Sequence, residues 1–304
     1  MSVAVVIPSF NRREVTLKCL DAIYEYPSKE LTIIVVDSGS TDGTRECVVD
    51  KFPGVKLVAT DSNKWWAGAT NVGIRFALEY GCNKIITYND DNIATEGLFD
   101  TLIRTSNLYP DAIISSVCCY VDQPQTVFFA GRMRGKYSDR YYYLHHNVQY
   151  CTLTLEVNEV DLLHGMCTII PKSVFQSLGL FDEKAFPHLY ADDDLVLRSR
   201  AAGYRALVEP RAVVLNDRAI TGMNPYYRKL KLGEVFSLLT SRRSVFEIRT
   251  HTVFLWRHRR SIFTFIFTWI SNYLRLIILV VIKWILPDKK YTKIMSILSS
   301  FANR

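Results

Sequence analysis

The chain has 304 residues, of which 49% are hydrophobic and 22% are charged, a composition that fits a folded globular protein and excludes wholesale disorder. Its net charge of +7 is unevenly distributed, because residues 1–225 carry 22 Lys or Arg and 27 Asp or Glu, whereas residues 226–304 carry 15 and 3. We therefore predict a mildly acidic domain over 1–225 and a strongly basic C-terminal region over 226–304. A basic region of this kind suits nucleic acid or an anionic membrane surface.

The acidic part alternates short apolar runs with helical patterns. The apolar runs predict strands at 3–7, 31–36, 55–59, 84–88 and 112–117. The patterns between them predict helices at 12–24, up to about residue 50, at 66–80 and at 96–108. Such alternation predicts an α/β fold with a mostly parallel sheet that is covered by helices on both faces.

The chain changes character over residues 118–160, which are rich in aromatic residues and Thr and predict a β-hairpin or an irregular insertion. A further core strand at 168–170 precedes a short helix that starts at Pro171. A helix at 194–202 and two short strands at 206–208 and 212–215 complete this part. The seven cysteines lack paired spacing and the N-terminus lacks a basic leader, so we expect free thiols and a cytoplasmic protein.

The basic region contains an apolar, aromatic stretch at 261–286 that is long enough to span a bilayer. Asn272 and Arg275 interrupt it, and a central Arg is costly in lipid. Basic residues at 257–260 and several Trp and Tyr suit a helix that lies among lipid headgroups. We therefore expect peripheral membrane attachment rather than nucleic-acid binding, with a buried C-terminal helix as the alternative.

Two clusters of carboxylates carry the main functional signal. Asp90 and Asp91 follow a predicted strand, and three acids at 192–194 open a predicted helix. Adjacent carboxylates repel, so a fold keeps them together only with a cation, a helix N-terminus or open water nearby. The first pair predicts a site for a hard cation such as Mg²⁺, and an acid of the second cluster can accept a proton at neutral pH. Helix capping is the structural alternative for both clusters.

Further polar groups are expected near these acids. Ligands of open α/β sheets lie beyond the carboxyl ends of the strands, where Asp37 follows the second strand. Asp37 can also be explained as an ordinary turn residue. His164, just before the later core strand, is a candidate acceptor-side residue. The sequence lacks GxGxxG, GxxxxGK[ST], GxSxG and HExxH motifs, which argues against dinucleotide-binding, P-loop, α/β-hydrolase and zinc-protease chemistry.

Several segments, in this order and spacing, resemble the family 2 glycosyltransferases of the GT-A fold, in particular bacterial rhamnosyltransferase-like enzymes of surface polysaccharide synthesis. The segments are VVIPSFNR at 5–12, IVVDSGSTDG at 34–43, NKWWAGATNVG at 63–73, YNDDN at 88–92, LFDE at 180–183 and DDDL at 192–195, with Arg198 and Gly203. The resemblance covers about residues 1–220. It implies an α/β sheet of the GT-A type, followed here by a C-terminal basic, aromatic helical region.

The resemblance also implies roles for the matched residues. The nucleotide would be bordered by Pro8, Phe10, Asp37 and Asp90. Asp91 would bind a divalent metal, Mn²⁺ or Mg²⁺. Asp192 would be the catalytic base, and Asp194 and Arg198 would support its loop.

Three departures from the family pattern leave alternatives open. Ala191 stands where the family usually has Glu, so a shift by one residue would make Asp193 the base. Asn216 and Asp217 occupy the region of a usual metal-binding His, which leaves the third ligand open. The QxxRW motif of processive synthases is absent, which implies one sugar per encounter.

The implied activity is inverting, metal-dependent transfer of one sugar, with rhamnose suggested, from a nucleotide-diphosphate donor. The acceptor would be a hydroxyl of a glycan or lipid-linked precursor of the cell surface, at the inner face of the cell membrane. A nucleotidyltransferase is one alternative, although the segment at 9–12 lacks the Gly-rich loop of that class. A non-catalytic membrane scaffold with a decayed transferase domain is another.

Overall fold

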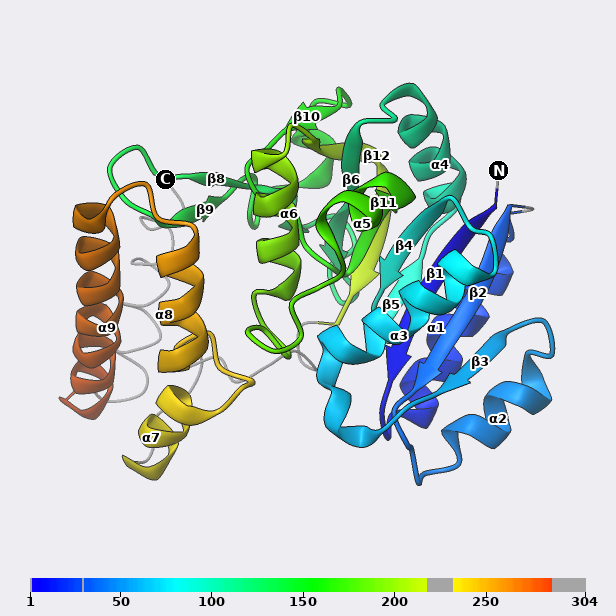
Figure 1. The fold of residues 1–304 in the computed structure, drawn as a ribbon, viewed down its shortest axis with the longest axis horizontal. Helices are drawn as coiled ribbons and strands as arrows, with labels where there is room; N and C mark the ends of the chain where they lie inside the picture. The colour runs from blue at the N-terminus through cyan, green and yellow to red at the C-terminus, as the bar shows by residue number, and fades with distance from the viewer. Residues whose placement is uncertain (1, 29, 218–231, 286–304) are drawn as a thin grey trace. The chain divides into compact units, whose positions relative to one another are not determined.

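The computed structural model describes residues 2–28, 30–217 and 232–285 (Figure 1). The chain divides into two compact units, one made of 1–132 with 144–220 and the other of 133–143 with 221–304. The second unit therefore joins a short segment from the middle of the chain to the C-terminal helices, a pairing that the prediction of two consecutive parts did not include. Residues 218–231 and 286–304 of the predicted parts lie outside the described residues.

The first unit is built on a ten-stranded sheet with the central order β12-β6-β11-β4-β1-β2-β3. Its main strands are β1 (Val3–Ser9), β2 (Leu31–Asp37), β3 (Lys56–Ala59), β4 (Lys84–Tyr88), β6 (Ala112–Tyr120), β11 (Cys167–Pro171) and β12 (Arg205–Asn216). Short strands at its periphery are β5 (Asn92–Ala94), β7 (Val127–Phe129) and β10 (Asn158–Glu159). β1, β2, β3 and β4 pair in parallel, as do β6 and β12. The predicted mostly parallel sheet is confirmed.

Two details of the sheet differ from expectation. β11 runs antiparallel to both of its neighbours, β4 and β6, although it is fully central. The two short strands expected at 206–208 and 212–215 form one strand, β12, whose register shifts between Glu209 and Val213. Pro210 lies inside this irregular segment and has no N–H to donate, which explains why the apolar pattern is interrupted while the strand continues.

Helices cover both faces of the sheet (Figure 1). They are α1 (Arg13–Glu25), α2 (Thr44–Lys51), α3 (Trp65–Glu79), α4 (Leu98–Leu108), α5 (Lys172–Leu178) and α6 (Ala191–Ala201). On one face Leu20 of α1 and Leu102 of α4 share a core with Val5 of β1. On the other face α3 approaches so closely that a Cβ on Gly73 would lie 2.4 Å from Cγ1 of Val6.

The strand order turns at β1, and this turning point positions the site. β1 pairs with β2 on one side and with β4 on the other, and the chain reaches β4 only after building β2 and β3. The loops after β1 and β4 therefore leave the same edge of the sheet and diverge. In open parallel sheets such a switch point forms the crevice where ligands bind.

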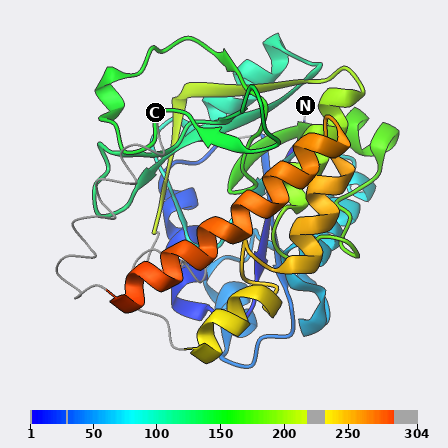
Figure 2. The same cartoon turned by 90° about the vertical axis from the view of Figure 1, so that its left-hand side faces the viewer.

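The second unit contains α7 (Leu232–Thr240), α8 (Ile248–Arg257) and α9 (Ile262–Ile285), shown in Figure 2. Its mid-chain part is a two-stranded hairpin of β8 (Arg132–Arg134) and β9 (Tyr141–Tyr143), so the predicted insertion does contain a hairpin. The hairpin forms hydrogen bonds to polar side chains of α9. The backbone N–H of Asp139 donates to Thr268, and the Arg140 guanidinium donates to Asn272.

Candidate active site

The predicted metal loop is neutralised by an arginine from the loop after β1. Nη1 of Arg12 lies 2.7 Å from Oδ1 of Asp90, and Nη2 lies 3.2 Å from Oδ2 of Asp91. Both carboxylates are buried, with 4% and 6% of their surface exposed. Burial raises the pKa of Asp90 to about 7, although the Arg12 charge pulls in the opposite direction. The switch point therefore holds two buried carboxylates whose charge is balanced by Arg12.

Asn216 at the end of β12 completes this cluster. The pairing of β12 with β5 places Asn216 opposite Asn92. Its Nδ2 donates to Oδ1 of Asp91 at 2.8 Å and to Oδ1 of Asn92 at 2.9 Å. Its buried Oδ1 has no hydrogen-bond donor among the described residues, and such orphaned oxygens in native structures often mark a missing ion or water.

These groups fit a hard divalent cation. Within 2–28, 30–217 and 232–285, no three His, Cys, Asp or Glu side chains gather as a complete metal cage. Mg²⁺ does not need one, because it is usually held by one or two carboxylates together with water and substrate phosphates. Asp90, Asp91 and the amide oxygen of Asn216 supply ligands of this kind.

A short loop before β11 brings the second acid cluster to the metal loop. Nδ2 of Asn92 donates to the carbonyl of Met166 at 2.6 Å. The neighbouring N–H of Gly165 donates to Oδ2 of Asp192 at 2.8 Å. Asn92, which follows Asp91, and Asp192 therefore contact adjacent residues of one loop, and α6 begins at the same edge of the sheet (Figure 1).

The three acids that open α6 have different partners. Oδ2 of Asp194, which is fully buried, accepts from Nε of Arg198 at 2.8 Å. Asp193 is 4% exposed and forms an ion pair with Arg132, while burial raises its pKa to about 7 against the pull of that arginine. Asp192 alone is only half-buried. Of the three carboxylates, it is the one placed to meet a ligand.

Arg198 also anchors the loop in front of α6. Its Nη1 and Nη2 donate to the carbonyls of Leu178 and Leu180 at 2.9 and 3.1 Å. The Asp194–Arg198 pair therefore joins the first turns of α6 to the preceding segment. These are the contacts that a supporting role for both residues requires.

His164 lies in the core below the loop. Its Nδ1 accepts from the N–H of Met166 at 3.0 Å, and its Nε2 lies 3.0 Å from Oγ of Ser115. Burial lowers its pKa to about 3, so the ring is neutral. His164 is 6% exposed, and both of its ring nitrogens contact protein atoms. The ring is therefore not positioned to contact the glycan acceptor. In this setting it shapes the loop that carries Gly165.

The predicted nucleotide side lies after β1 and β2. The backbone N–H of Ser38 donates to the carbonyl of Ser9 at 2.9 Å and joins the two loops. Asp37 is 1% exposed and accepts from the N–H of Ser40 at 3.2 Å, so it does shape a turn. Pro8 is half-buried, whereas the Phe10 ring is 42% exposed.

Trp66 and Gly165 belong to the site but received no role from the sequence. Nε1 of Trp66 donates to Oδ1 of Asn89 at 3.0 Å. A Cβ on Gly165 would lie 2.7 Å from Cη2 of Trp66 and 3.2 Å from Cβ of Asp192. Two features of the sequence could have indicated a role for Trp66. It lies within one of the matched segments, and an indole N–H that is removed from water usually needs a hydrogen-bond acceptor. Nothing in the sequence around Arg12 or Arg132 predicts which acids these arginines pair with in the fold.

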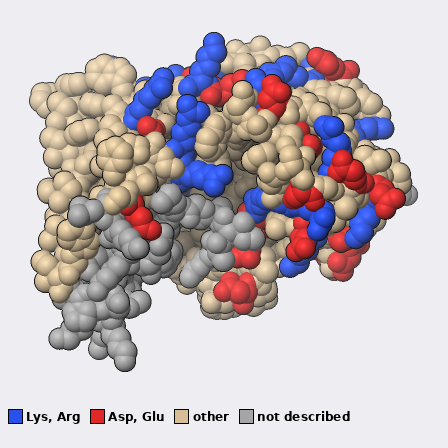
Figure 3. All heavy atoms as spheres, turned by 90° about the horizontal axis from the view of Figure 1, so that it is seen from below, with Lys and Arg blue, Asp and Glu red and all other residues tan. Residues whose placement is uncertain are grey.

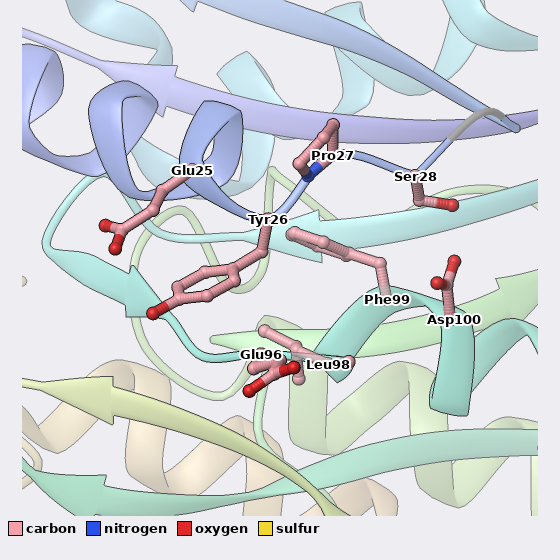
Figure 4. A pocket seen from close by; sticks show the side chains of 9 residues that line it. Glu25, Tyr26, Pro27, Ser28, Glu96, Leu98, Phe99 and Asp100 are labelled. Carbon is pink, nitrogen blue, oxygen red and sulfur yellow. The ribbon is translucent and has the colours of Figure 1, made fainter.

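The described residues also form a separate cavity of about 300 Å³ between the end of α1 and the start of α4 (Figure 4). Glu25, Tyr26, Phe99 and Asp100 are among its lining residues. None of the predicted site residues lines it.

Comparison with known proteins identifies the family of this chain. The sequence pattern of glycosyl transferase family 2 matches residues 4–170. The chain belongs to this family. It is 28% identical over 219 residues to an N-acetylglucosaminyl-diphospho-decaprenol L-rhamnosyltransferase of Mycobacterium tuberculosis, covering 65% of this chain and 70% of that protein. It is 25% identical over 283 residues to the dTDP-rhamnosyl transferase RfbF of Shigella flexneri, covering 86% of each.

Solved structures show the same fold. A mannosyltransferase from Pyrobaculum calidifontis, in complex with GDP-Man and Mn²⁺, superposes with a TM-score of 0.55 at 17% identity over 99% of this chain and 80% of that one. GalNAc-T7, with UDP, GalNAc and Mn²⁺, superposes with a TM-score of 0.57 at 12% identity over 85% and 54%. The predicted family, the GT-A fold and the glycosyltransferase activity are confirmed.

Proposed function

We propose that this glycosyltransferase moves one rhamnose from a nucleoside-diphosphate donor to a hydroxyl of a lipid-linked glycan precursor, with inversion at the anomeric carbon. The observation that carries the proposal is that Asn92, the neighbour of Asp91, and Asp192 bond to adjacent residues of the 164–166 loop. The activities of the two rhamnosyltransferase relatives named above support rhamnose as the sugar, and the mycobacterial relative supports a lipid diphosphate acceptor.

Asp91, with Asp90 and Asn216, would hold Mn²⁺ or Mg²⁺. When bound, the ion would neutralise the charge that grows on the departing nucleoside diphosphate. Asn216 keeps Asp91 oriented through its Nδ2 contact and supplies an oxygen from the same side chain. Phe10, exposed beside the buried Asp37, offers a ring face for the nucleotide base. Pro8 precedes it and stiffens the backbone there.

Asp192 would be the base. The acceptor oxygen attacks the anomeric carbon, the bond from that carbon to the diphosphate oxygen breaks with its electron pair, and the acceptor proton passes to Asp192. The Gly165 N–H occupies one carboxylate oxygen and fixes its orientation, which leaves the other free to receive the proton. A single displacement of this kind inverts the configuration. Asp193 is the weaker candidate because Arg132 holds it in the interior.

Transfer from dTDP-rhamnose to a short-chain N-acetylglucosaminyl-diphospho lipid, with Mn²⁺, tests this proposal. Asp192→Asn should lower kcat by roughly 10²–10⁴-fold, as expected for loss of a general base, while dTDP binding is unchanged. Asp91→Asn should weaken binding of dTDP with Mn²⁺. Asp111→Asn, an exposed acid before β6, is the matched control. Wild-type turnover by Asp192→Asn would exclude Asp192 as the base.

We also propose that α9 attaches the enzyme to the membrane where such acceptors reside. Its polar Thr268 is completely buried by the second unit, whereas its apolar side faces outward. The exposed apolar residues are Phe263, Ile266, Phe267, Ile270, Leu274, Ile277, Ile278 and Val281. This inverts the usual arrangement of a soluble helix, and the face shown in Figure 3 has few charged side chains at its left-hand end.

The segment Ile262–Ile282 is long and apolar enough to cross a membrane by composition, and only 12% of it is buried, unlike a core helix. Because Asn272 is bonded within the unit, its cost in lipid is reduced, and the basic residues around 257–260 favour anionic headgroups. We favour a helix that lies in the interface at the inner face of the cell membrane.

Co-sedimentation with phosphatidylglycerol vesicles tests this attachment. The double variant Phe267→Glu, Ile270→Glu should lose most vesicle binding. Leu108→Glu is the matched control, because Leu108 is 70% exposed but lies at the end of α4 in the first unit. Undiminished vesicle binding by the α9 variant would contradict the assignment.

A further inference from the structure

Arg12 bridges the acid pair to which the metal is assigned. It contacts Oδ1 of Asp90 and Oδ2 of Asp91, as described above. The remaining oxygens also have neighbours, since Oδ1 of Asp91 accepts from Asn216 and Oδ2 of Asp90 lies 3.5 Å from Oγ1 of Thr16. Each carboxylate oxygen therefore has a protein neighbour, and a cation that approaches both acids meets the positive charge of Arg12, which bridges them.

Arg12 is the partner best able to leave. The side chains of Asp90 and Asp91 are 5% and 3% exposed, whereas that of Arg12 is 30% exposed. Asn216 and Thr16 are buried on β12 and α1. Two cations competing for one buried acid pair also repel each other. Displacement of the guanidinium toward solvent is therefore the path that requires the least rearrangement.

After displacement from the acids, the guanidinium of Arg12 would remain close to the diphosphate of the bound donor. Its backbone is fixed at the start of α1, where the carbonyl of Arg12 accepts from the N–H of Thr16 at 2.8 Å. A guanidinium is a planar fork that binds phosphate oxygens through two parallel hydrogen bonds. The diphosphate of the proposed donor brings such oxygens together with the metal.

We propose that Arg12 is an exchangeable counter-ion, which neutralises Asp90 and Asp91 in the free enzyme and moves to the diphosphate when the metal and nucleotide bind. This inference rests on the proposed metal site. Its consequence is ordered, mutually dependent binding: the metal alone binds weakly because it must displace Arg12, and the diphosphate offsets that cost by giving Arg12 a new partner.

The expected size of the effect follows from the population of the displaced state. A minor conformer separated by a few kcal/mol is populated at about 0.1–10%, and the apparent Kd of its ligand rises by the inverse of that fraction. Replacing Arg12 should therefore tighten binding of Mn²⁺ alone by at least about tenfold. The same replacement should weaken binding of the Mn²⁺–pyrophosphate complex by at least about tenfold, because the phosphate contact is lost.

The experiment compares wild type, Arg12→Gln and Arg12→Lys by calorimetric titration with Mn²⁺ alone and with the Mn²⁺–pyrophosphate complex. Pyrophosphate removes any dependence on the identity of the base or sugar. Opposite changes in the two affinities support the exchange. Arg12→Lys keeps the charge without the fork, so Mn²⁺ binding should stay near wild type while pyrophosphate binding weakens. Arg205→Gln, which removes an exposed partner of Glu159, is the matched control.

The melting temperature provides a second readout if Arg12→Gln is less stable. Saturating Mn²⁺ should raise the melting temperature of Arg12→Gln more than that of wild type, because it replaces the lost counter-ion. Equal Mn²⁺ affinities in wild type and Arg12→Gln would overturn the exchange while leaving the metal site intact. Mn²⁺ binding that survives Asp91→Asn in both backgrounds would instead overturn the proposed metal site.

Discussion

His164 should make the first unit sensitive to mild acid. The ring is buried and neutral, and its pKa falls from 6.5 to about 3 because burial disfavours the charged form. Its Nδ1 accepts two backbone N–H groups, from Met166 and Cys167, so protonation there also breaks two hydrogen bonds. These bonds shape the loop from which Gly165 reaches Asp192. Acid should therefore affect stability and site geometry together.

The sign and size of this effect follow from linkage. Because the pKa of His164 is depressed on folding, its contribution to stability is present above the unfolded pKa of 6.5 and is lost as pH falls toward 3. Between pH 7 and pH 5 the unfolded chain gains about 0.7 proton at this position, while the folded chain gains almost none. The free energy of unfolding should therefore drop by about 2 kcal/mol from this residue alone.

Urea denaturation of wild type and His164→Asn at pH 7 and pH 5 measures this term. Asn is chosen because its Oδ1 can accept from the N–H of Met166 in place of Nδ1. The variant should be less stable at pH 7 yet lose about 2 kcal/mol less than wild type between the two pH values. His251 in the second unit, whose pKa is lowered to about 4, contributes equally to both proteins. An identical pH dependence would refute the buried neutral state of His164.

Three further substitutions test the packing around the site. Gly165→Ala would bring its Cβ within 2.7 Å of Trp66, so kcat should fall by about 10–100-fold in a transfer assay because the base is displaced. In Gly73→Ala the added Cβ would lie 2.4 Å from Cγ1 of Val6. This overlap should lower the free energy of unfolding, measured by urea denaturation, by about 1–3 kcal/mol. Trp66→Phe removes the 3.0 Å bond to Asn89 and should weaken Mn²⁺–pyrophosphate binding severalfold in calorimetry while melting nearly as wild type.

The alternating pattern of the first unit made its architecture predictable. β1, β2 and β4 are continuous apolar runs because both faces of a parallel strand are covered, and each run ends where a polar loop begins. Since parallel strands share one carboxyl edge, the placement of Asp37 and Asp91 at that edge followed from their positions after two of these strands. The direction of β11 could not be predicted in this way, because a buried strand has the same composition in either direction.

Pairings between distant segments were beyond local patterns. Arg12 follows β1 by a few residues, yet nothing in its neighbourhood indicates contact with acids almost eighty positions later. The 133–143 hairpin has an aromatic sequence that predicts strands, but its assembly with α9 depends on hydrogen bonds such as Arg140 to Asn272. In the sequence Asn272 interrupts an apolar stretch, whereas in the fold its side chain bonds to Arg140 and His251 on the polar side of α9.

The partners of the three α6 acids also account for the departure at Ala191. Charges this close are tolerated because each has its own compensation: Arg198 for Asp194, Arg132 for Asp193 and a backbone N–H for Asp192. Ala191 is completely buried, so a Glu at this position would place a further carboxylate in the interior beside Asp193 and Asp194. The Glu of the family's pair is thus absent here, and the proposed mechanism assigns proton transfer to Asp192 because Asp193 is engaged by Arg132.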